Sequence, residues 1–567
     1  KNTDFGNYDV PSGAVIHSEE EHHDDEDHDE DEHHDDEHSE EDLGYINNSD
    51  FAVEATKFGV SKVTDWGYIG FGIDNLESVY GIPFHGDEHG DEHGDEHGDE
   101  HGDEEEHEEH GEERIFSTTD SETFSIRGSY NVNGSLVNKV DFTYRDSDYS
   151  LTEAHAEEEH HEEEDHEEEE EHEEHAPTVF MNEAVEYGAT FDISNDSSTQ
   201  KVVVNFVDED NSIVGEEAFM NPANSKEFTI GYYLSKDLGI YDLDVGFRHD
   251  QIERSGSVTE EEHDDDHGDE HGDEHGEVDY YNIDDSTNSF AVTLGRSLTD
   301  NLGISLGYAS VERLPSSIEL FMNGPHMATG RFEVGDPNLN SETSNNFDIT
   351  FNFDNGDFYA YASFYITDVD NYIALIDEED DHMDEDEHHE DEDDHHEEEG
   401  EHHEDEHDDH GHGNLIHANY MQEDAEFDGY EIEIGRSFDL GSGELALSFG
   451  RDVVNAEFAD GHYIPRINPA RNIYSLVYTQ DDLLFKLMLK DVEKQNDIGE
   501  GETATDAYQM LNTRLTKTFN GMGEGELKVS LFANNLLDEV ARNHSSFVKN
   551  EVPLPGRNYG LKFNLTF

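Results

Sequence analysis

The sequence predicts an all-β fold, a transmembrane antiparallel β-barrel, and three observations lead to this prediction. Apolar residues recur at every second position over stretches of eight to ten residues between the charged parts of the chain. Short turns alternate along the sequence with long acidic connections. The last alternating stretch stops on an aromatic residue, Phe567. Alternation is typical of a half-exposed strand, and such strands joined by short and long connections in turn are typical of a membrane barrel.

Five stretches show the alternation most clearly, and in each of them the apolar residues share one face of the expected strand. These stretches are residues 289–298, 303–311, 357–366, 430–438 and 557–567. Short polar turns are expected at residues 299–301, 354–357 and 441–443. A soluble β-sandwich would explain the alternation equally well. It explains less well the unequal connections and the roughly twenty strands that the chain has room for.

Most of the charge lies in five low-complexity tracts. The chain has a formal net charge of −118, and the tracts contain 35 of its 39 histidines, 82 of its 147 acidic residues and no Lys or Arg. The tracts are residues 17–42, 85–113, 153–175, 260–277 and 377–417. Outside them about 430 residues of ordinary composition remain, which is enough for a large folded unit.

This composition excludes several classes of function. The negative charge opposes binding to nucleic acid and to anionic membrane surfaces, and it favours cations. The chain has no cysteine, so disulfides, thiolate metal sites and thiol catalysis are all excluded. No apolar run reaches the ~20 residues that a membrane-spanning helix needs.

The tracts have the chemistry of a metal-binding sequence. Imidazole and carboxylate together suit zinc, whereas calcium and magnesium would use oxygen ligands alone; nickel and copper also accept imidazole. Glycine at every fourth position disfavours a helix, so we expect long disordered loops that present many weak sites. The alternative is acidic solvation, which has no use for regularly spaced histidines. The regular ligand candidates are His85, His89, His93, His97, His101, His267, His271 and His275.

No enzymatic motif lies in a context that would support catalysis, so we expect neither an enzyme nor a catalytic cofactor. "GISLG" at Gly303–Gly307 matches a nucleophile-elbow pattern, but it lies within an alternating strand. "HEDEH" at His403–His407 matches a zinc-protease pattern, but such a match arises by chance in a tract of His and acidic residues.

Four segments resemble the TonB-dependent receptors of the bacterial outer membrane. "VERLPSSIELFMNGPHMATGRFEVGDPNLNSETSNNFDI" (Val311–Ile349) resembles their mid-barrel segment, and "LFANNLLDEVARNHSSFVKNEVPLPGRNYGLKFNLTF" (Leu531–Phe567) resembles their C-terminal segment. "GYIGFGIDNLESVYGIPFHG" and "RINPARN" resemble two further family segments. With the His-rich loops, "NGPHMATG" and "ARNHSSFVKN" are most similar to the zinc-uptake (ZnuD-like) group.

The resemblance implies a 22-stranded barrel that follows an N-terminal plug domain and a TonB-contacting box. Residues 1–567 would all belong to the barrel, because the opening "KNTDFGNYDVP" resembles the end of an early barrel strand. The plug, the box and the first strand are then expected outside this chain, which would be a fragment of a longer protein.

Two residues are candidate ligands for a defined metal site: the resemblance implies His326, and Glu183 is a candidate because it follows a tract. His326 lies in "NGPHMATG", in an outer loop expected to fold toward the lumen; the alternative is a loop histidine that only hydrogen-bonds locally. Glu183, in "FMNEAVEYGATF", could supply a carboxylate, and plug residues would complete the site. His249 and His462 have no distinctive spacing, and His544 is expected to be structural.

The sequence therefore predicts a multi-pass protein of the bacterial outer membrane that takes up divalent metal, with zinc as the transported ligand. Its expected partners are divalent ions, outer-membrane lipid and lipopolysaccharide, and the TonB complex acting through the plug. Two alternatives remain open. One is a metal-buffering or adhesive surface protein in which the barrel is an anchor. The other is a receptor for haem or another metal chelate, which would use a few placed His and Tyr residues.

Overall fold

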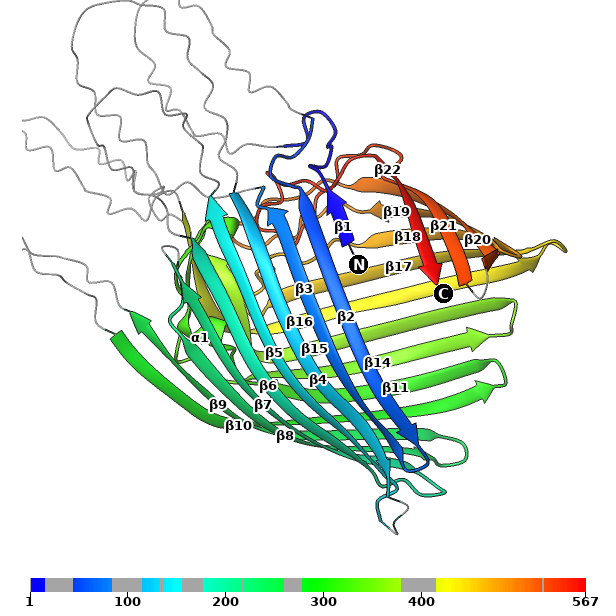
Figure 1. Cartoon of the computed structure of the whole chain (residues 1–567), viewed down its shortest axis with the longest axis horizontal. Coiled ribbons are helices and arrows are strands. Elements are labelled where there is room, and N and C mark those ends of the chain that lie inside the picture. The colour runs from blue at the N-terminus through cyan, green and yellow to red at the C-terminus, as the bar shows by residue number, and fades with distance from the viewer. Residues whose placement is uncertain are drawn as a thin grey trace, which may run out of the picture.

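The computed structural model of this 567-residue chain consists almost entirely of β-structure (Figure 1). It describes residues 2–15, 44–83, 115–132, 134, 136–155, 177–215, 218–259, 278–378, 415–522 and 525–566. The interiors of all five tracts lie outside these ranges, so the prediction of disordered loops concerns residues that the structure does not describe.

The strands are long, commonly 12 to 20 residues, and follow one another along the chain. In the first half they are β1 (Asn2–Phe5), β2 (Phe51–Thr64), β3 (Gly67–Gly81), β4 (Ile115–Asn131), β5 (Lys139–His155), β6 (Thr178–Asp192), β7 (Thr199–Val214), β8 (Ala223–Asp237), β9 (Asp242–Thr259), β10 (Val278–Thr299) and β11 (Leu302–Arg313). In the second half they are β12 (Asn323–His326), β13 (Arg331–Val334), β14 (Glu342–Asp354), β15 (Phe358–Asp377), β16 (Ile416–Asp439), β17 (Glu444–Phe458), β18 (Arg471–Gln480), β19 (Leu483–Val492), β20 (Tyr508–Met522), β21 (Gly525–Asn534) and β22 (Asn558–Thr566).

The helical elements of the described residues are short. They are α1 (Ser317–Phe321) and the 3₁₀ turn η1 (Met327–Thr329). In this part of the chain no helix has the length and apolar character needed to cross a membrane.

All 22 strands belong to one sheet, but they are not equivalent. Each strand from β1 to β11 pairs antiparallel with the next, β11 pairs with β14, and the same pattern continues to β22. Twenty strands thus make one continuous antiparallel run, while β12 and β13 form a four-residue hairpin between β11 and β14. The all-β antiparallel fold is confirmed. The run has twenty strands, and the other two strands of the 22-stranded sheet, β12 and β13, belong to a connection.

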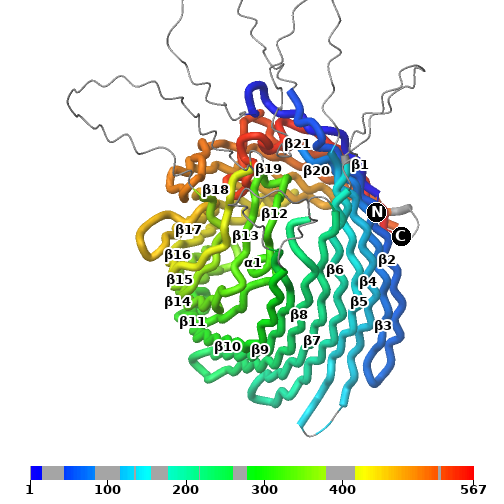
Figure 2. Tube along the Cα trace, turned by 90° about the vertical axis from the view of Figure 1, so that its left-hand side faces the viewer, coloured from blue at the N-terminus to red at the C-terminus, as the bar shows by residue number. Residues whose placement is uncertain are grey.

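The sheet curves strongly, and its two ends approach each other (Figures 1 and 2). Among the described residues the ladders join β1 to β2 and β22 to β21. The segments beside these end strands contact each other directly. Tyr8 donates its hydroxyl to the carbonyl of Pro553 at 2.9 Å, and the backbone N–H of Gly556 donates to Asp9 at 2.8 Å.

Short turns lie at one end of the strands and long connections at the other (Figure 1). The three turns expected from the sequence all join consecutive strands, namely β10–β11, β14–β15 and β16–β17. Gly356 and Gly441 adopt φ values of 94° and 78° in two of these turns, a backbone conformation that costs glycine little. The predicted turns are therefore confirmed, and the described residues on either side of each tract lie at the opposite end of the strands.

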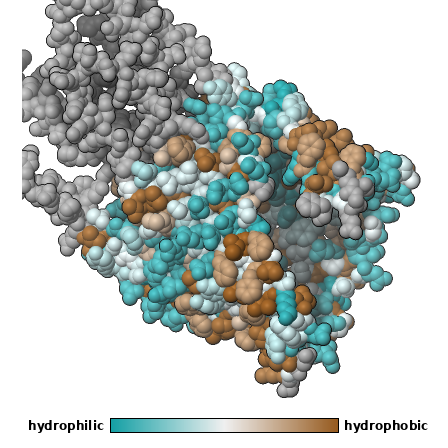
Figure 3. All heavy atoms as spheres, viewed as in Figure 1, coloured by the Kyte–Doolittle hydropathy of each residue, from teal (hydrophilic) through white to brown (hydrophobic). Residues whose placement is uncertain are grey.

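The outer face of the strands is apolar near the short turns. In β22 the alternating residues Tyr559, Leu561, Phe563 and Leu565 are 70, 53, 63 and 53% exposed. Figure 3 shows apolar residues gathered over β22 and over the short-turn halves of β2 and β3. This is the alternation that the sequence predicted, with the apolar side facing outward as in a membrane barrel.

Buried hydrophobic clusters lie instead at the end with the long connections. The largest joins residues of the β7–β8 connection to the end of α1, and a second packs residues of β15, β16 and β17 against Ile464. Smaller ones include Met327, Phe332 and Leu415. The outer connections thus form the packed core of the molecule and position the candidate site.

Candidate functional site

The connection between β11 and β14, residues 314–341, turns inward from the wall, and α1, β12 and β13 lie within the ring of strands (Figure 2). Ser316 caps α1 by accepting a hydrogen bond from the backbone N–H of Glu319, whose side chain accepts from the Ser316 N–H. Arg313, at the end of β11, pairs with Glu319 and with Glu342 of β14, both at 2.9 Å. The inward turn is therefore fixed to the two wall strands that flank it.

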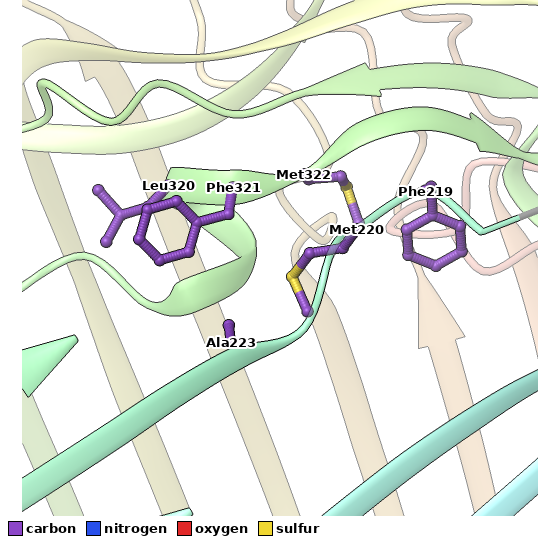
Figure 4. Packing of buried hydrophobic residues seen from close by; sticks show 6 residues of the cluster. All are labelled: Phe219, Met220, Ala223, Leu320, Phe321 and Met322. Atoms are coloured by element: carbon purple, nitrogen blue, oxygen red, sulfur yellow. The ribbon is translucent and has the colours of Figure 1, made fainter. Parts of the chain in front are cut away.

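The end of α1 packs against the connection between β7 and β8 (Figure 4). Met220 and Met322 form an isolated antiparallel bridge, and the backbone N–H of Asn323 donates to the carbonyl of Phe219 at 2.7 Å. Six buried side chains close this contact: Phe219, Met220, Ala223, Leu320, Phe321 and Met322. Burial of so many apolar groups holds the first strand of the hairpin against one side of the wall.

The second strand of the hairpin is attached to a different part of the wall. Residues 331–334 of β13 pair in parallel with residues 416–419 of β16. Arg331, which is buried, donates to both carboxylate oxygens of Asp377 at 2.8 and 2.6 Å. The β12–β13 hairpin thus connects the β7–β8 side with the β15–β16 side.

His326 is the last residue of β12, and its ring is held from two directions. Its Nδ1 lies 2.8 Å from Oε1 of Glu333, which is buried on the facing strand. Its ring lies 4.9 Å from the ring of Phe219, centroid to centroid. Thr329 places its hydroxyl oxygen 3.0 Å from the same Glu333 oxygen. The structure therefore puts His326 on an inward-folded outer connection, where the sequence predicted it.

His326 lines a pocket of about 560 Å³ between the hairpin and strands β5 to β9. Arg254 and Glu227 form an ion pair of 3.1 Å in its wall, so their charges compensate each other. The apolar lining residues include Phe180, Ile213, Phe219, Met220, Ile318 and Met322, and the polar ones Tyr149, Asn182, Glu209, Glu227, Arg254 and His326. Apolar atoms make up most of the exposed lining of the pocket, and its polar side chains could orient a ligand.

Glu183 lies apart from this pocket. The side chain of its neighbour Asn182 donates to Glu209 and Asn211 in the pocket wall, and successive side chains of a strand point to opposite faces. Glu183 is accordingly on the other face of β6, where it stands opposite Asp148 of β5 and Asp210 of β7. The structure does not bring Glu183 and His326 into one site.

The tract ligand candidates cannot be compared with this geometry. His85, His89, His93, His97, His101, His267, His271 and His275 all lie outside the described residues. Within the described residues no group of three or more His, Asp or Glu side chains is arranged to hold a metal ion. His326 therefore stands as a single candidate ligand in a pocket.

The other three histidines outside the tracts have different surroundings. His249 lies on β9 with its Nδ1 3.0 Å from the side-chain oxygen of Asn288. His462 is 78% exposed and pairs with Asp460 at 2.8 Å. His544 is 1% exposed, with Nε2 3.1 Å from Oε1 of Glu502. The buried position of His544 agrees with the structural role expected for it.

Glu502 is the centre of a second buried polar cluster. Its carboxylate accepts hydrogen bonds from Lys549 Nζ at 2.9 Å and from the backbone N–H of Arg466 at 3.1 Å. Burial opposes its ionisation, but His544, Lys549 and the Arg466 N–H outweigh burial and lower the pKa of Glu502 to about 2. This cluster ties together the connections after β17, β19 and β21.

Sequence reasoning missed Glu333, Arg331 and Asp377, which fix the hairpin. In a chain with 147 acidic residues, nothing in "GRFEV" or "ALID" distinguishes these side chains. The capping pair of Ser316 and Glu319 was a readable signal of the helix start, because a Ser and a Glu three residues apart form a capping box.

Comparison with solved structures gives the same architecture. The copper transporter OprC matches with a TM-score of 0.64 and 13% identity over 91% of this chain and 72% of that one. The FrpB iron transporter from Neisseria meningitidis (F3-3 variant) matches with 0.62 and 12% over 99% and 75%. The ferric-catecholate import receptor Fiu from E. coli K12 matches with 0.59 and 11% over 91% and 74%. At these identities the likeness shows the fold alone.

A family model decides the assignment. Residues 42–536 match the model described as "TonB dependent receptor-like, beta-barrel", which is most of the chain. The match extends over strands β2 to β21 and over the inward-folded hairpin. The chain therefore belongs to the TonB-dependent receptor β-barrel family.

Proposed function

We propose that this protein imports zinc through the bacterial outer membrane, that His326 is a ligand on the path, and that the His-rich tracts capture the ion. Barrels of the TonB-dependent receptor family are outer-membrane proteins that act in transport and are not enzymes. The relatives with solved structures are a copper transporter, an iron transporter and a ferric-catecholate receptor. The proposal adds two points to this family membership: the transported metal is zinc, and the tracts capture it.

The observation that carries the proposal is the position of the longest tract relative to His326. The described residues on both sides of residues 379–414 contact the hairpin or each other. Ile416 donates its N–H to the carbonyl of Gly330 at 3.1 Å, and Glu378 donates its N–H to His417 at 2.8 Å. A metal ion held by that tract would thus be captured on a segment whose two ends are fixed beside His326.

The donor chemistry favours zinc among the possible metals. Imidazole and carboxylate are the only ionisable donors that the tracts offer, and this set suits zinc better than a hard ion such as calcium. Copper and nickel bind the same donors. Selectivity has to be measured with all three metals at buffered free concentrations.

The first test is His326→Ala with His462→Ala as its matched control. Both residues are outer-connection histidines with Nδ1 2.8 Å from a carboxylate, but only His326 lines the pocket. We expect His326→Ala to reduce zinc uptake even when zinc is plentiful, because the ligand is lost from the path. We expect His462→Ala to match the wild type. Uptake of ⁶⁵Zn by cells expressing each variant measures both, and equal uptake by His326→Ala and wild type would remove His326 from the path.

A second candidate function is uptake of a metal chelate. The observation that favours it is the pocket of about 560 Å³ with its mainly apolar lining, which exceeds the needs of a single ion. A chelate receptor would lose uptake of the chelate when Phe219 is replaced by Ala and would keep it when the tract histidines are removed. The zinc importer predicts dependence on the tracts. A surface protein that only buffers metal would bind zinc without any uptake.

A further inference from the structure

The contact between His326 and Glu333 sets the chemical form of the imidazole. Glu333 is 3% exposed, and its Oε1 lies 2.8 Å from Nδ1 of His326. If the carboxylate is the acceptor in this contact, Nδ1 is the ring nitrogen that carries the proton. In a neutral imidazole the lone pair is then on Nε2, and Nε2 is the nitrogen left to bind a metal.

Glu333 is itself held in place on three sides. Thr329 lies with its hydroxyl oxygen 3.0 Å from Glu333 Oε1 and 2.9 Å from the His326 carbonyl. On β13 the residues before it are fixed, since Arg331 pairs with Asp377 and Phe332 is buried against Met327. The carboxylate therefore meets the imidazole from a rigid strand. Such support is what holds a ligand in a productive orientation.

The His462–Asp460 pair differs from the His326–Glu333 pair in its exposure to water. Both pairs have an Nδ1-to-carboxylate distance of 2.8 Å. The side chains of His462 and Asp460 are 78% and 47% exposed, whereas those of His326 and Glu333 are 30% and 4% exposed. Water can replace Asp460 as a partner of its histidine, but water has little access to Glu333. Only the buried carboxylate can fix its histidine.

We propose that Glu333 is the positioning residue for His326: it does not bind the metal, but it fixes the tautomer and the ring orientation of the ligand. This inference rests on the proposed function, because it assigns a role to Glu333 only if His326 binds the transported ion. It adds a residue that no sequence pattern singles out.

The experiment uses the full chain in cells, with free zinc set by a chelator. Half-saturating free zinc and maximal uptake rate are measured for Glu333→Ala, Glu333→Gln and the matched control Asp460→Asn. For Glu333→Ala we expect half-saturating zinc to rise about 10- to 100-fold, the usual loss when an outer-shell partner is removed. Maximal rate should change much less. Glu333→Gln keeps an acceptor oxygen and should lie between Glu333→Ala and wild type, and Asp460→Asn should match wild type.

A double-mutant cycle separates positioning from mere structural support. If Glu333 acts only through His326, adding Glu333→Ala to His326→Ala causes no further loss. Additive losses would show that Glu333 supports the fold, and would overturn the proposal. Amounts of each variant in the outer membrane are measured so that poor assembly is not read as poor binding.

The two proposals fail in different ways. Unchanged uptake by His326→Ala overturns the proposed function, and the role of Glu333 falls with it. Impaired uptake by His326→Ala together with a wild-type profile for Glu333→Ala overturns the positioning role alone.

Discussion

Phe547 is the residue through which three outer connections meet. The guanidinium carbons of Arg331 and Arg466 lie 4.3 and 4.4 Å from the centroid of its ring. Arg331 is paired with Asp377, and the backbone N–H of Arg466 donates to Glu502. A cation–π contact shielded from water contributes ~2 kcal/mol. One aromatic side chain therefore couples the hairpin that carries His326 to the connections after β17 and β21.

The pKa of Glu502 predicts how this coupling depends on pH. Its pKa is about 2 in the folded protein and ~4.3 in an unfolded chain, so it is depressed on folding. A depressed carboxyl pKa stabilises the folded state fully above the unfolded pKa. The stabilisation is lost as pH falls through the folded pKa. We expect the thermal midpoint of the purified protein to drop between pH 4.5 and 2 for this reason.

Glu502→Gln isolates the effect. Its charge-free side chain leaves Lys549 and His544 without their carboxylate, which should cost about 3 kcal/mol at pH 7. The substitution should also reduce the drop of the thermal midpoint between pH 4.5 and 2. Glu500, an exposed residue of the same connection, is the control, and Glu500→Gln should follow the wild type. Parallel pH curves for wild type and Glu502→Gln would contradict the role assigned to Glu502.

At the scale of the element, the β12–β13 hairpin depends on a close backbone approach. A Cβ at Gly324 would lie 2.8 Å from the Cα of Phe219, and a backbone atom cannot yield as a flexible side chain can. We expect Gly324→Ala to destabilise the protein by about 1–3 kcal/mol and to raise half-saturating zinc, because the hairpin must move away from Phe219.

Gly246→Ala is the matched control for that variant. On β9 an added methyl group would meet only the Cβ of Ala291, at 4.0 Å. Thermal unfolding in detergent and zinc uptake are compared for both variants. If Gly324→Ala behaves like Gly246→Ala in both measurements, the hairpin is not held by this contact.

The wall strands could be predicted because their signal is local. Nine or ten consecutive residues are enough to reveal the alternation in 289–298 or 358–366, and these stretches are parts of β10 and β15. The hairpin could not be predicted in this way. Its strands have four residues each, Pro325 removes a backbone donor from β12, and the partner of β13 lies at the far end of a tract. Short elements held by distant partners leave little trace in a local pattern.

The candidate site was likewise predictable only where its signal is local in the sequence. His326 is one of four histidines outside the tracts, so its motif could be recognised in the sequence. Glu333 is distinguished only by burial and by its 2.8 Å contact, both of which depend on the folded hairpin. Glu183 shows the opposite error: it lies close to a tract in the sequence, but it does not line the pocket that contains His326.

At the scale of the whole molecule, the tracts are separable from the fold. The strands that flank residues 85–113 are paired up to their ends: Gly81 stands opposite Phe116, and Ile82 donates its N–H to Ile115 at 2.9 Å. We expect deletion of residues 85–113 to leave the barrel assembled. Growth under zinc limitation should weaken, while uptake at high zinc should stay nearly unchanged because the path through the barrel is intact.

The control for that deletion keeps the length and the carboxylates. In it the seven histidines of residues 85–113 are replaced by Gln. If the histidines capture zinc, this variant should grow as poorly as the deletion under zinc limitation. Growth like that of the wild type would mean that the tract acts as an acidic solvating segment, and the capture role would have to be abandoned.

The pairing of the strand ends that flank residues 85–113 also determines how freely the length of this tract can vary. Because β3 and β4 are paired up to the ends that flank the tract, the fold does not depend on how many "HGDE" units the tract contains. Closing a connection costs free energy that grows only with the logarithm of its length, about 0.6 kcal/mol for each doubling. Gain or loss of whole units by slippage at the gene level would thus be almost neutral for folding while changing the number of imidazoles in proportion. The repeat count can act as a heritable adjustment of metal-binding capacity that leaves the rest of the receptor untouched.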